Sequence, residues 1–215
     1  MLRNAVGIGV AVGAYGLSFG AAAVAAGLST LQACALSLLM FTGASQFAAV
    51  GVLGAGGTAV AAVASALLLG TRNTLYAVRL SSLLPTRGPR RLLAAQLTID
   101  ESTGMATGAP DGLAGTAFWA TGASVYVLWN AATLLGALGA ARLEDPGVLG
   151  LDAAVPAAFL ALLWPQLRDR RMVAVAAGGA LVALVAVPLT PAGVPVLLAG
   201  LAVLPVLLRK AGTSR

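Results

Sequence analysis

Four ionisable side chains, those of Arg72, Arg79, Asp100 and Glu101, lie in stretches of sequence that are otherwise apolar and long enough to span a bilayer. A charged side chain at the centre of a transmembrane helix costs about 2.5–3.5 kcal/mol even on a mild insertion scale. Such residues therefore usually pair with one another, line a cavity, or bind a substrate or proton. The pattern predicts a membrane transporter.

The two arginines differ in depth. Arg72 lies thirteen residues before Pro85, which is about 20 Å along a helix and too far for the side chain to reach the membrane interface easily. Arg79 lies six residues before Pro85, about 9 Å from it, so a long side chain can snorkel from there. Arg72, Tyr76 and Arg79 recur at helical spacing and share one helix face, which should contact protein or water.

Asp100 and Glu101 are adjacent, so on a helix their side chains point about 100° apart. We expect them to have different roles: one balances Arg72 and the other faces a pathway. A carboxylate in an apolar cavity can carry a proton, whereas one beside an arginine stays ionised. The alternative is a buried ion pair that only fixes helix register.

Composition indicates an all-α, polytopic helical membrane protein. Hydrophobic residues make up 59% of the 215 residues and charged residues only 9%, with a mean hydropathy of +0.94. Soluble domains usually contain about 25% charged residues. The chain leaves no room for a separate soluble domain, so residues 1–215 form a single integral membrane domain.

Apolar residues come in eight blocks, most of them near the roughly 20 residues that a helix needs to cross a bilayer. The blocks are 5–27, 31–56, 58–84, 92–108, 113–140, 148–167, 172–189 and 194–208. The first resembles a signal peptide in its flanks but is long enough to span, so we expect an uncleaved helix.

Orientation follows from the Lys and Arg residues, which mark cytoplasmic connections. They gather at 87–91, 168–171 and 209–215. If all eight blocks cross the membrane, 87–91 lies outside. If blocks 31–56 and 92–108 enter and return, all three basic sites lie inside and the acidic pair at 144–145 lies outside. The charge rule thus favours six crossings with two re-entrant or broken segments, and eight crossings with one exception remains the alternative.

Both suspect blocks also contain a polar interruption. The first is Thr42-Gly43-Ala44-Ser45-Gln46, and the second is Thr98-Ile99-Asp100-Glu101-Ser102-Thr103-Gly104. Non-helical backbone at membrane depth is tolerated where protein or a watery cavity satisfies its polar groups, and broken helices often mark a transporter's binding site. The two interruptions are therefore the predicted site.

The residues at these interruptions resemble a known family. Gly43 to Phe47, Arg72 to Tyr76 and the run from Arg90-Arg91 to Asp100-Glu101 are similar to the AzlC-type large subunit of bacterial branched-chain amino acid exporters. The resemblance covers nearly the whole chain and weakens after about residue 140. Gly70 and Asn73 stand where that family commonly has Asn and an aromatic residue or His.

The resemblance implies export of branched-chain and related apolar amino acids across the bacterial cytoplasmic membrane. It also implies a small partner subunit of the AzlD type, itself a membrane protein. The departures at Gly70 and Asn73 leave the exact substrate open.

An amino acid presents a carboxylate, an ammonium and a side chain. Arg72 or the free N–H groups of a broken helix could bind the carboxylate, and Asp100, Glu101 or free carbonyl groups could bind the ammonium. The predicted substrate-binding residues are Thr42, Ser45, Gln46, Arg72, Asn73, Tyr76, Asp100 and Glu101. Asp100 and Glu101 are also the predicted proton-coupling residues.

Other functions fit less well. The basic residues sit at the ends of apolar blocks and act as orientation signals, which argues against nucleic acid. The chain has no histidine, which excludes a Ser-His pair and a histidine zinc site, and an aspartyl pair of Asp100 with Asp152 has no supporting motif. We predict no enzyme, cofactor or metal. A non-transporting scaffold subunit, a channel and a small exporter of another type, such as the LysE type, remain alternatives.

Small residues and tryptophans complete the predictions. Gly9 with Gly13, and Gly16 with Gly20, have the spacing that lets two helices approach closely. We favour internal packing over a partner subunit for this face. The tryptophans divide into Trp164, a predicted interface anchor, and Trp119 and Trp129, for which no role is assigned.

Overall fold

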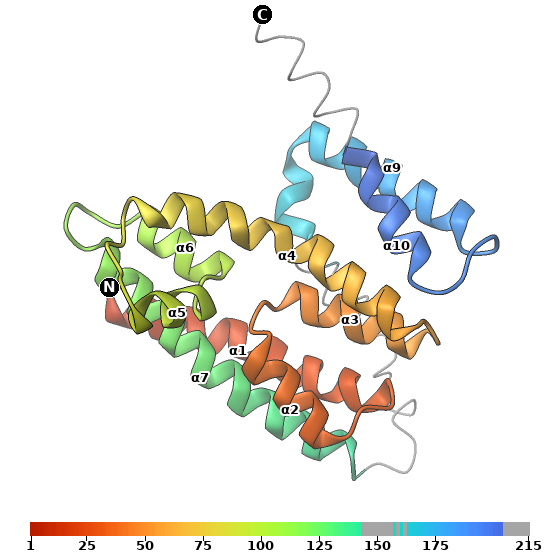
Figure 1. Cartoon of the computed structure of the whole chain (residues 1–215), viewed down its shortest axis with the longest axis horizontal. Coiled ribbons are helices and arrows are strands. Elements are labelled where there is room, and N and C mark those ends of the chain that lie inside the picture. The colour runs from red at the N-terminus through yellow and green to blue at the C-terminus, as the bar shows by residue number, and fades with distance from the viewer. Residues whose placement is uncertain (143–156, 158–159, 161–162, 204–215) are drawn as a thin grey trace, which may run out of the picture.

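Every regular element among the described residues is a helix. The computed structural model describes residues 1–142, 157, 160 and 163–203. In chain order the elements are α1 Leu2–Ala25, α2 Thr30–Leu39, α3 Ala44–Gly54, α4 Ala59–Ser81, α5 Pro89–Gln96, α6 Asp100–Thr107, α7 Ala114–Ala140, η3 Trp164–Arg168, α9 Arg170–Ala186, α10 Val194–Ala199 and η4 Gly200–Val203 (Figure 1). The all-α prediction is confirmed for these residues. Most of the predicted block 148–167, Asp152, the acidic pair at 144–145 and the basic tail at 209–215 lie outside them.

Helices α1 and α7 form the central pair and run in parallel. An ideal Cβ on Gly13 would lie 3.1 Å from Cβ of Leu128, and one on Gly16 would lie 2.6 Å from the carbonyl oxygen of Trp129. Residues later in α1 therefore contact residues later in α7, which shows that the two helices are parallel. Of the described helices, these two, of 24 and 27 residues, are long and apolar enough to span a bilayer. The glycine spacing in α1 serves internal packing, as predicted.

The predicted block 31–56 is interrupted, and the chain reverses direction there. On α2, Ser37 donates a hydrogen bond to Thr133 at 3.2 Å, and the Tyr126 hydroxyl donates to the Leu38 carbonyl at 3.2 Å, so α2 runs antiparallel to α7. On α3, Gly54 packs close to Ala26 at the end of α1, so α3 runs back beside α1. The break covers residues 40–43, and the two short helices form a hairpin (Figure 1).

The predicted block 92–108 is interrupted in the same way at residues 97–99. One apolar cluster contains Leu80, Leu84, Ala94, Ala106 and Phe118. It joins the end of α4, helix α5, the far end of α6 and the start of α7. Because α5 and the far end of α6 both pack in this cluster, the α5–α6 pair is also a hairpin (Figure 1).

The two hairpins enter from opposite ends of the bundle. The N-terminus and the connections at 82–88 and 108–113 lie at one end, called the Arg87 end; the connections at 26–29 and 55–58 lie at the other, called the Gly57 end (Figure 1). The α9–α10 connection packs on the Gly57 end. An ideal Cβ on Gly57 would lie 2.9 Å from the Ala192 carbonyl oxygen, and one on Gly193 would lie 2.7 Å from the Val52 side chain.

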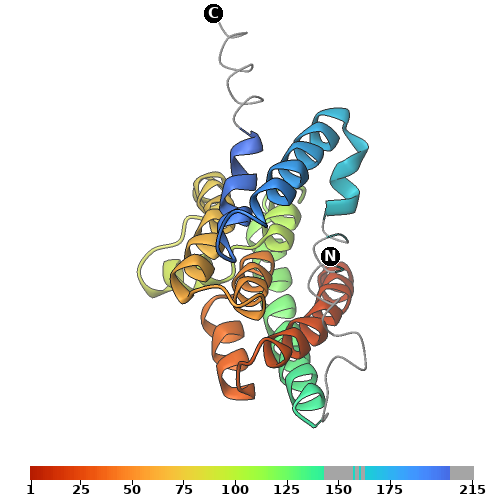
Figure 2. The ribbon, with the colours of Figure 1, turned by 90° about the vertical axis from the view of Figure 1, so that its right-hand side faces the viewer.

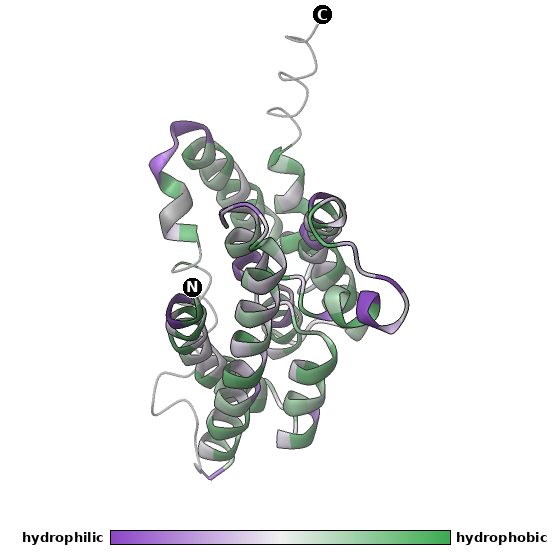
Figure 3. Cartoon of the chain, turned by 90° about the vertical axis from the view of Figure 1, so that its left-hand side faces the viewer, coloured by the Kyte–Doolittle hydropathy of each residue, from purple (hydrophilic) through white to green (hydrophobic). Residues whose placement is uncertain are grey.

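The outer faces of the helices are apolar. Leu31, Leu39, Val60, Leu75 and Leu92 are each more than 70% exposed. Hydrophilic residues gather mainly at the connections and helix ends, whereas the sides of the helices are largely hydrophobic (Figure 3). Seen from the side, the α9–α10 pair stands beyond α3 and α4, away from α1 and α7 (Figure 2). An apolar surface of this extent requires lipid or a partner to cover it.

Candidate functional site

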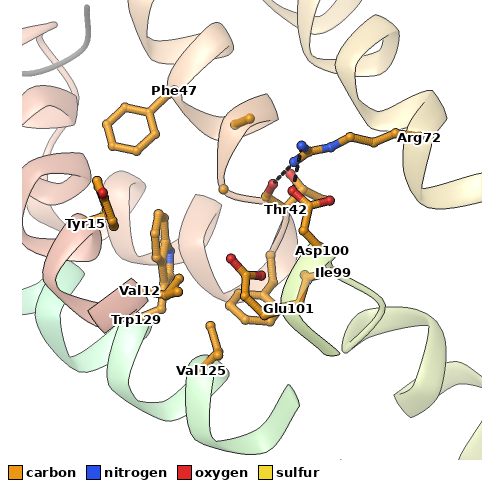
Figure 4. Close-up of a pocket in the computed structure, with 13 residues that line it drawn as sticks. Val12, Tyr15, Thr42, Phe47, Arg72, Ile99, Asp100, Glu101, Val125 and Trp129 are labelled. Carbon is orange, nitrogen blue, oxygen red and sulfur yellow. Dashed lines mark hydrogen bonds and ion pairs between the residues drawn. The ribbon is translucent and has the colours of Figure 1, made fainter. Parts of the chain in front are cut away.

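The two interruptions meet at a cavity of about 120 Å³ in the middle of the bundle. Its wall includes residues 42–44, which precede and begin α3, and residues 99–101, which precede and begin α6. Arg72 contributes from α4 and Trp129 from α7 (Figure 4). The volume is comparable with the about 150 Å³ of an engineered cavity that binds benzene, so a small aliphatic group fits.

Arg72 connects the two interruptions. Its Nη1 atom lies 2.7 Å from Oδ2 of Asp100, the first residue of α6. Its Nη2 atom donates to the carbonyl of Thr42, just before α3, at 3.1 Å. Arg79, two turns further along α4, is exposed and forms no salt bridge within the described residues. The two arginines therefore differ in their contacts and exposure, and their depth in the membrane stays a prediction.

The first interruption is held by Gly43 and Gln46. Gly43 has φ +61°, a conformation that only glycine adopts easily. The Gln46 side chain is fully buried. Its Oε1 accepts hydrogen bonds from the N–H groups of Thr42 and Gly43, at 3.4 and 3.1 Å, and its Nε2 donates to the Leu36 carbonyl at 3.4 Å. Gln46 therefore satisfies backbone groups within the break and in α2 before it.

The second interruption is held by Ser102 and Thr98. The Ser102 hydroxyl accepts from the Ile99 N–H at 3.1 Å and donates to the Leu97 carbonyl at 2.5 Å. The Thr98 hydroxyl donates to the Ala94 carbonyl at 2.7 Å. Ser102 is the counterpart of Gln46, since each stands three residues after the residue that precedes its helix. The sequence analysis missed this role, although the position of a polar side chain in the third helical residue was the available signal.

The two helix starts differ in charge. The first turn of α6 carries Asp100 and Glu101, whereas the first turn of α3 carries no acidic residue. Asp100 pairs with Arg72, while Glu101 lines the cavity and forms no salt bridge within the described residues. The two adjacent carboxylates therefore have different surroundings, and their separate roles stay a prediction. The cavity wall thus has one acidic group without a salt-bridge partner among the described residues and, at the start of α3, the positive end of a helix that carries no acidic residue.

Aromatic rings form much of the remaining wall. Tyr15, Phe41, Phe47 and Trp129 all line the cavity. Phe47 meets Trp129 edge to face at a centroid distance of 6.3 Å. Phe19 stacks on Trp129 at a centroid distance of 6.1 Å and meets Phe47 edge to face at 5.5 Å. Sequence reasoning left these aromatic residues out, apart from the motif position of Phe47, because their convergence depends on the packing of α1, α3 and α7.

The predicted site residues divide into three groups. Those that line the cavity are Thr42, Arg72, Asp100 and Glu101. Tyr76 lies beside the ion pair and interacts with Asp100. Gln46 is not part of the cavity wall and stabilises the break through its hydrogen bonds to backbone groups. Ser45 faces α4, with its hydroxyl 3.6 Å from an ideal Cβ on Gly70, and Asn73 is also outside the cavity wall.

Comparison with known protein families identifies the family of the chain. The family model described as AzlC protein matches residues 7–143, which is more than half of the chain and includes both hairpins and the cavity. The chain belongs to the AzlC protein family. This is a membrane protein family associated with branched-chain amino acid transport, and it is not an enzyme family. No curated protein and no solved structure matches the chain.

The cavity lies in the part of the chain that the AzlC family model matches, whereas α9 and α10 follow that part. Within the described residues, no group of three or more His, Cys, Asp or Glu side chains is placed to hold a metal ion. The chemistry that the site offers is ion pairing, hydrogen bonding from helix starts, and apolar contact.

Proposed function

We propose that this AzlC protein exports small apolar amino acids of the branched-chain class, in exchange for protons, through the central cavity. The supporting observation is the unlike charge of the two helix starts. An amino acid zwitterion has an ammonium for Glu101, on α6, and a carboxylate for the N–H groups at the start of α3, where an anion is favoured. Val12 and Val125 supply apolar wall for a short side chain.

Proton exchange follows from competition for Glu101. Asp100 is neutralised by Arg72 at 2.7 Å, so Glu101 is the charge that a ligand must balance. It can be neutralised by the substrate ammonium or by a proton, but not by both. Substrate release to the outside would let a proton bind Glu101 from that side, and release of the proton to the cytoplasm would restore the site for the next substrate.

The arrangement of the hairpins supports a topology with two re-entrant segments. α2–α3 would enter the membrane from the Gly57 end and α5–α6 from the Arg87 end, so that neither pair crosses. The Arg87 end, with Arg87, Arg90 and Arg91, would face the cytoplasm. With three further crossings by the predicted blocks 148–167, 172–189 and 194–208, this arrangement would give the six crossings that the charge rule favours. We also propose a small AzlD-type membrane subunit as partner, on the family relationship alone.

Transport by the purified protein in liposomes tests the proposal. We expect outward-directed leucine or valine exchange driven by a proton gradient, and at least about tenfold slower exchange in Glu101→Gln, because the neutral amide cannot exchange a proton for an ammonium. Asp111→Asn, in the exposed 108–113 connection, is the matched control and should retain exchange. Proton-driven exchange that survives in Glu101→Gln would remove Glu101 from the mechanism. A protein that binds but never transports would support the scaffold alternative.

A further inference from the structure

Trp129 carries a buried hydrogen-bond donor without a partner. The side chain is only 3% exposed, and its Nε1–H has no hydrogen-bond acceptor within the described residues. An indole N–H can only donate, and buried donors in native proteins are nearly always hydrogen-bonded. Trp129 also lines the central cavity. An acceptor that enters the cavity would therefore satisfy it.

Packing contacts account for an aromatic ring at Trp129 but not for the polar Nε1–H group of the indole. The ring stacks on Phe19 at an interplanar angle of 24° and meets Phe47 at 88°. Both contacts require only an aromatic surface, which phenylalanine would also provide. The choice of an indole leaves one polar atom that no structural contact uses.

The position of the indole indicates which ligand group it meets. An ideal Cβ on Gly43 would lie 4.0 Å from Cη2 of Trp129, so the ring lies against the start of α3. Figure 4 shows Trp129 across the cavity from Arg72 and Asp100, with its nitrogen toward the Glu101 side. The donor thus stands between the start of α3, which favours an anion, and Glu101, which favours a cation.

We propose that the Trp129 Nε1–H donates a hydrogen bond to the carboxylate of the bound ligand, and that it forms the carboxylate subsite together with the N–H groups at the start of α3. This inference rests on the proposed function and adds a requirement to it. The site selects a ligand that carries a carboxylate next to its ammonium, and it discriminates against the amine that has the same side chain but lacks the carboxylate.

Binding of a matched ligand pair to purified protein in detergent tests the assignment. The probes are leucine and 3-methylbutylamine, which is leucine without its carboxylate. Trp129→Phe keeps the ring and removes the donor. A hydrogen bond to a charged group is worth about ten- to hundredfold in affinity, so we expect leucine to bind that much more weakly to Trp129→Phe and the amine to bind unchanged. Trp119→Phe, which lies outside the cavity wall, should bind both probes as the unaltered protein does.

Three results would overturn the inference in distinguishable ways. Unchanged leucine binding by a folded Trp129→Phe variant rejects the hydrogen bond. Equal losses for leucine and the amine show that Trp129 acts through Glu101 and not on the carboxylate. Absence of leucine binding by the unaltered protein rejects the proposed function, and this inference with it.

The indole resonance of the unaltered protein supplies a second readout that does not depend on the affinity of a variant. In ¹⁵N-labelled protein, the Nε1–H proton of Trp129 should move to lower field when leucine is added, because a new hydrogen bond to a carboxylate deshields it, and should stay in place when the amine is added. With three tryptophans in the chain, the Trp129→Phe spectrum assigns the signal. A signal that is insensitive to saturating leucine overturns the proposal even if affinity falls in the variant.

Discussion

Arg72 and Asp100 form an ion pair of 2.7 Å that joins the middle of α4 to the first residue of α6. The same guanidinium also donates to the Thr42 carbonyl, so one side chain connects the breaks of two hairpins that enter from opposite ends. The two side chains are 34% and 40% exposed, which indicates access to the cavity. A movement of either hairpin must stretch or break one of these contacts.

Removing both charges of this pair should cost less stability than removing each partner alone costs in total. Arg72→Ala leaves Asp100 unpaired, and Asp100→Asn leaves Arg72 without its anion, so we expect each to destabilise the protein by about 1–3 kcal/mol, toward the lower figure because both groups are partly exposed. The double variant Arg72→Ala with Asp100→Asn should lose less stability than the sum of the losses in the two single variants. Thermal unfolding in detergent measures the coupling, and strict additivity would show that the pair is not formed in solution.

Gln46 should matter more to stability than a surface glutamine in an equivalent place. Gln46→Ala removes hydrogen bonds to the backbone of the break and of α2 and leaves buried groups unsatisfied, which costs about 1–3 kcal/mol. Gln32 is the matched control, since its Oε1 accepts from the Ser29 N–H at the start of α2 but is exposed. Gln32→Ala should cost no more than about 0.5 kcal/mol. Comparing the unfolding temperatures of the two variants checks the difference.

The sequence was informative where local chemistry sets the structure. Gly43 and its small polar neighbours predicted a break because they interrupt an apolar run. The adjacency of Asp100 and Glu101 predicted, from helix geometry alone, that their side chains point in different directions. The different distances of Arg72 and Arg79 from Pro85 also followed from helix geometry. These inferences needed no knowledge of which helices touch.

The remaining features depend on contacts between distant segments. Trp129 reaches the cavity because α7 packs on α1 through close approaches such as that at Gly16, and nothing near residue 129 signals this. Ser45 was expected at the site, yet the phase of α3 turns it toward α4, whereas Gln46 turns toward the break. A polar residue near a break predicts the neighbourhood but not the direction of its side chain.

The contact between α1 and α7 should tolerate no added methyl group at its glycines. An ideal Cβ on Gly20 would overlap the backbone at Thr133 and Ala137, and backbone cannot move aside as a flexible side chain can. We expect Gly20→Ala to destabilise the protein by about 1–3 kcal/mol, as overpacked sites do. Gly7→Ala is the control on the same helix, since nothing lies within 4 Å of its ideal Cβ. It should be neutral or slightly stabilising. The unfolding temperatures of Gly20→Ala and Gly7→Ala in detergent test this prediction. Equal unfolding temperatures would contradict the close packing of α1 on α7.

The re-entrant topology predicts which connections share a side of the membrane. Single cysteines replace Ser82, Asp111 or Ala55, which are all exposed, in a protein whose one cysteine, Cys34, is changed to alanine. If neither hairpin crosses, Ser82 and Asp111 lie on the cytoplasmic side with the Arg87 end, and Ala55 lies on the opposite side. A membrane-impermeant maleimide should then label Ala55→Cys in intact cells and the other two only in inverted vesicles. If the α5–α6 pair crosses instead, Ser82→Cys and Asp111→Cys label from opposite sides, and that outcome would exclude the hairpin at this site even though the cavity itself stayed intact.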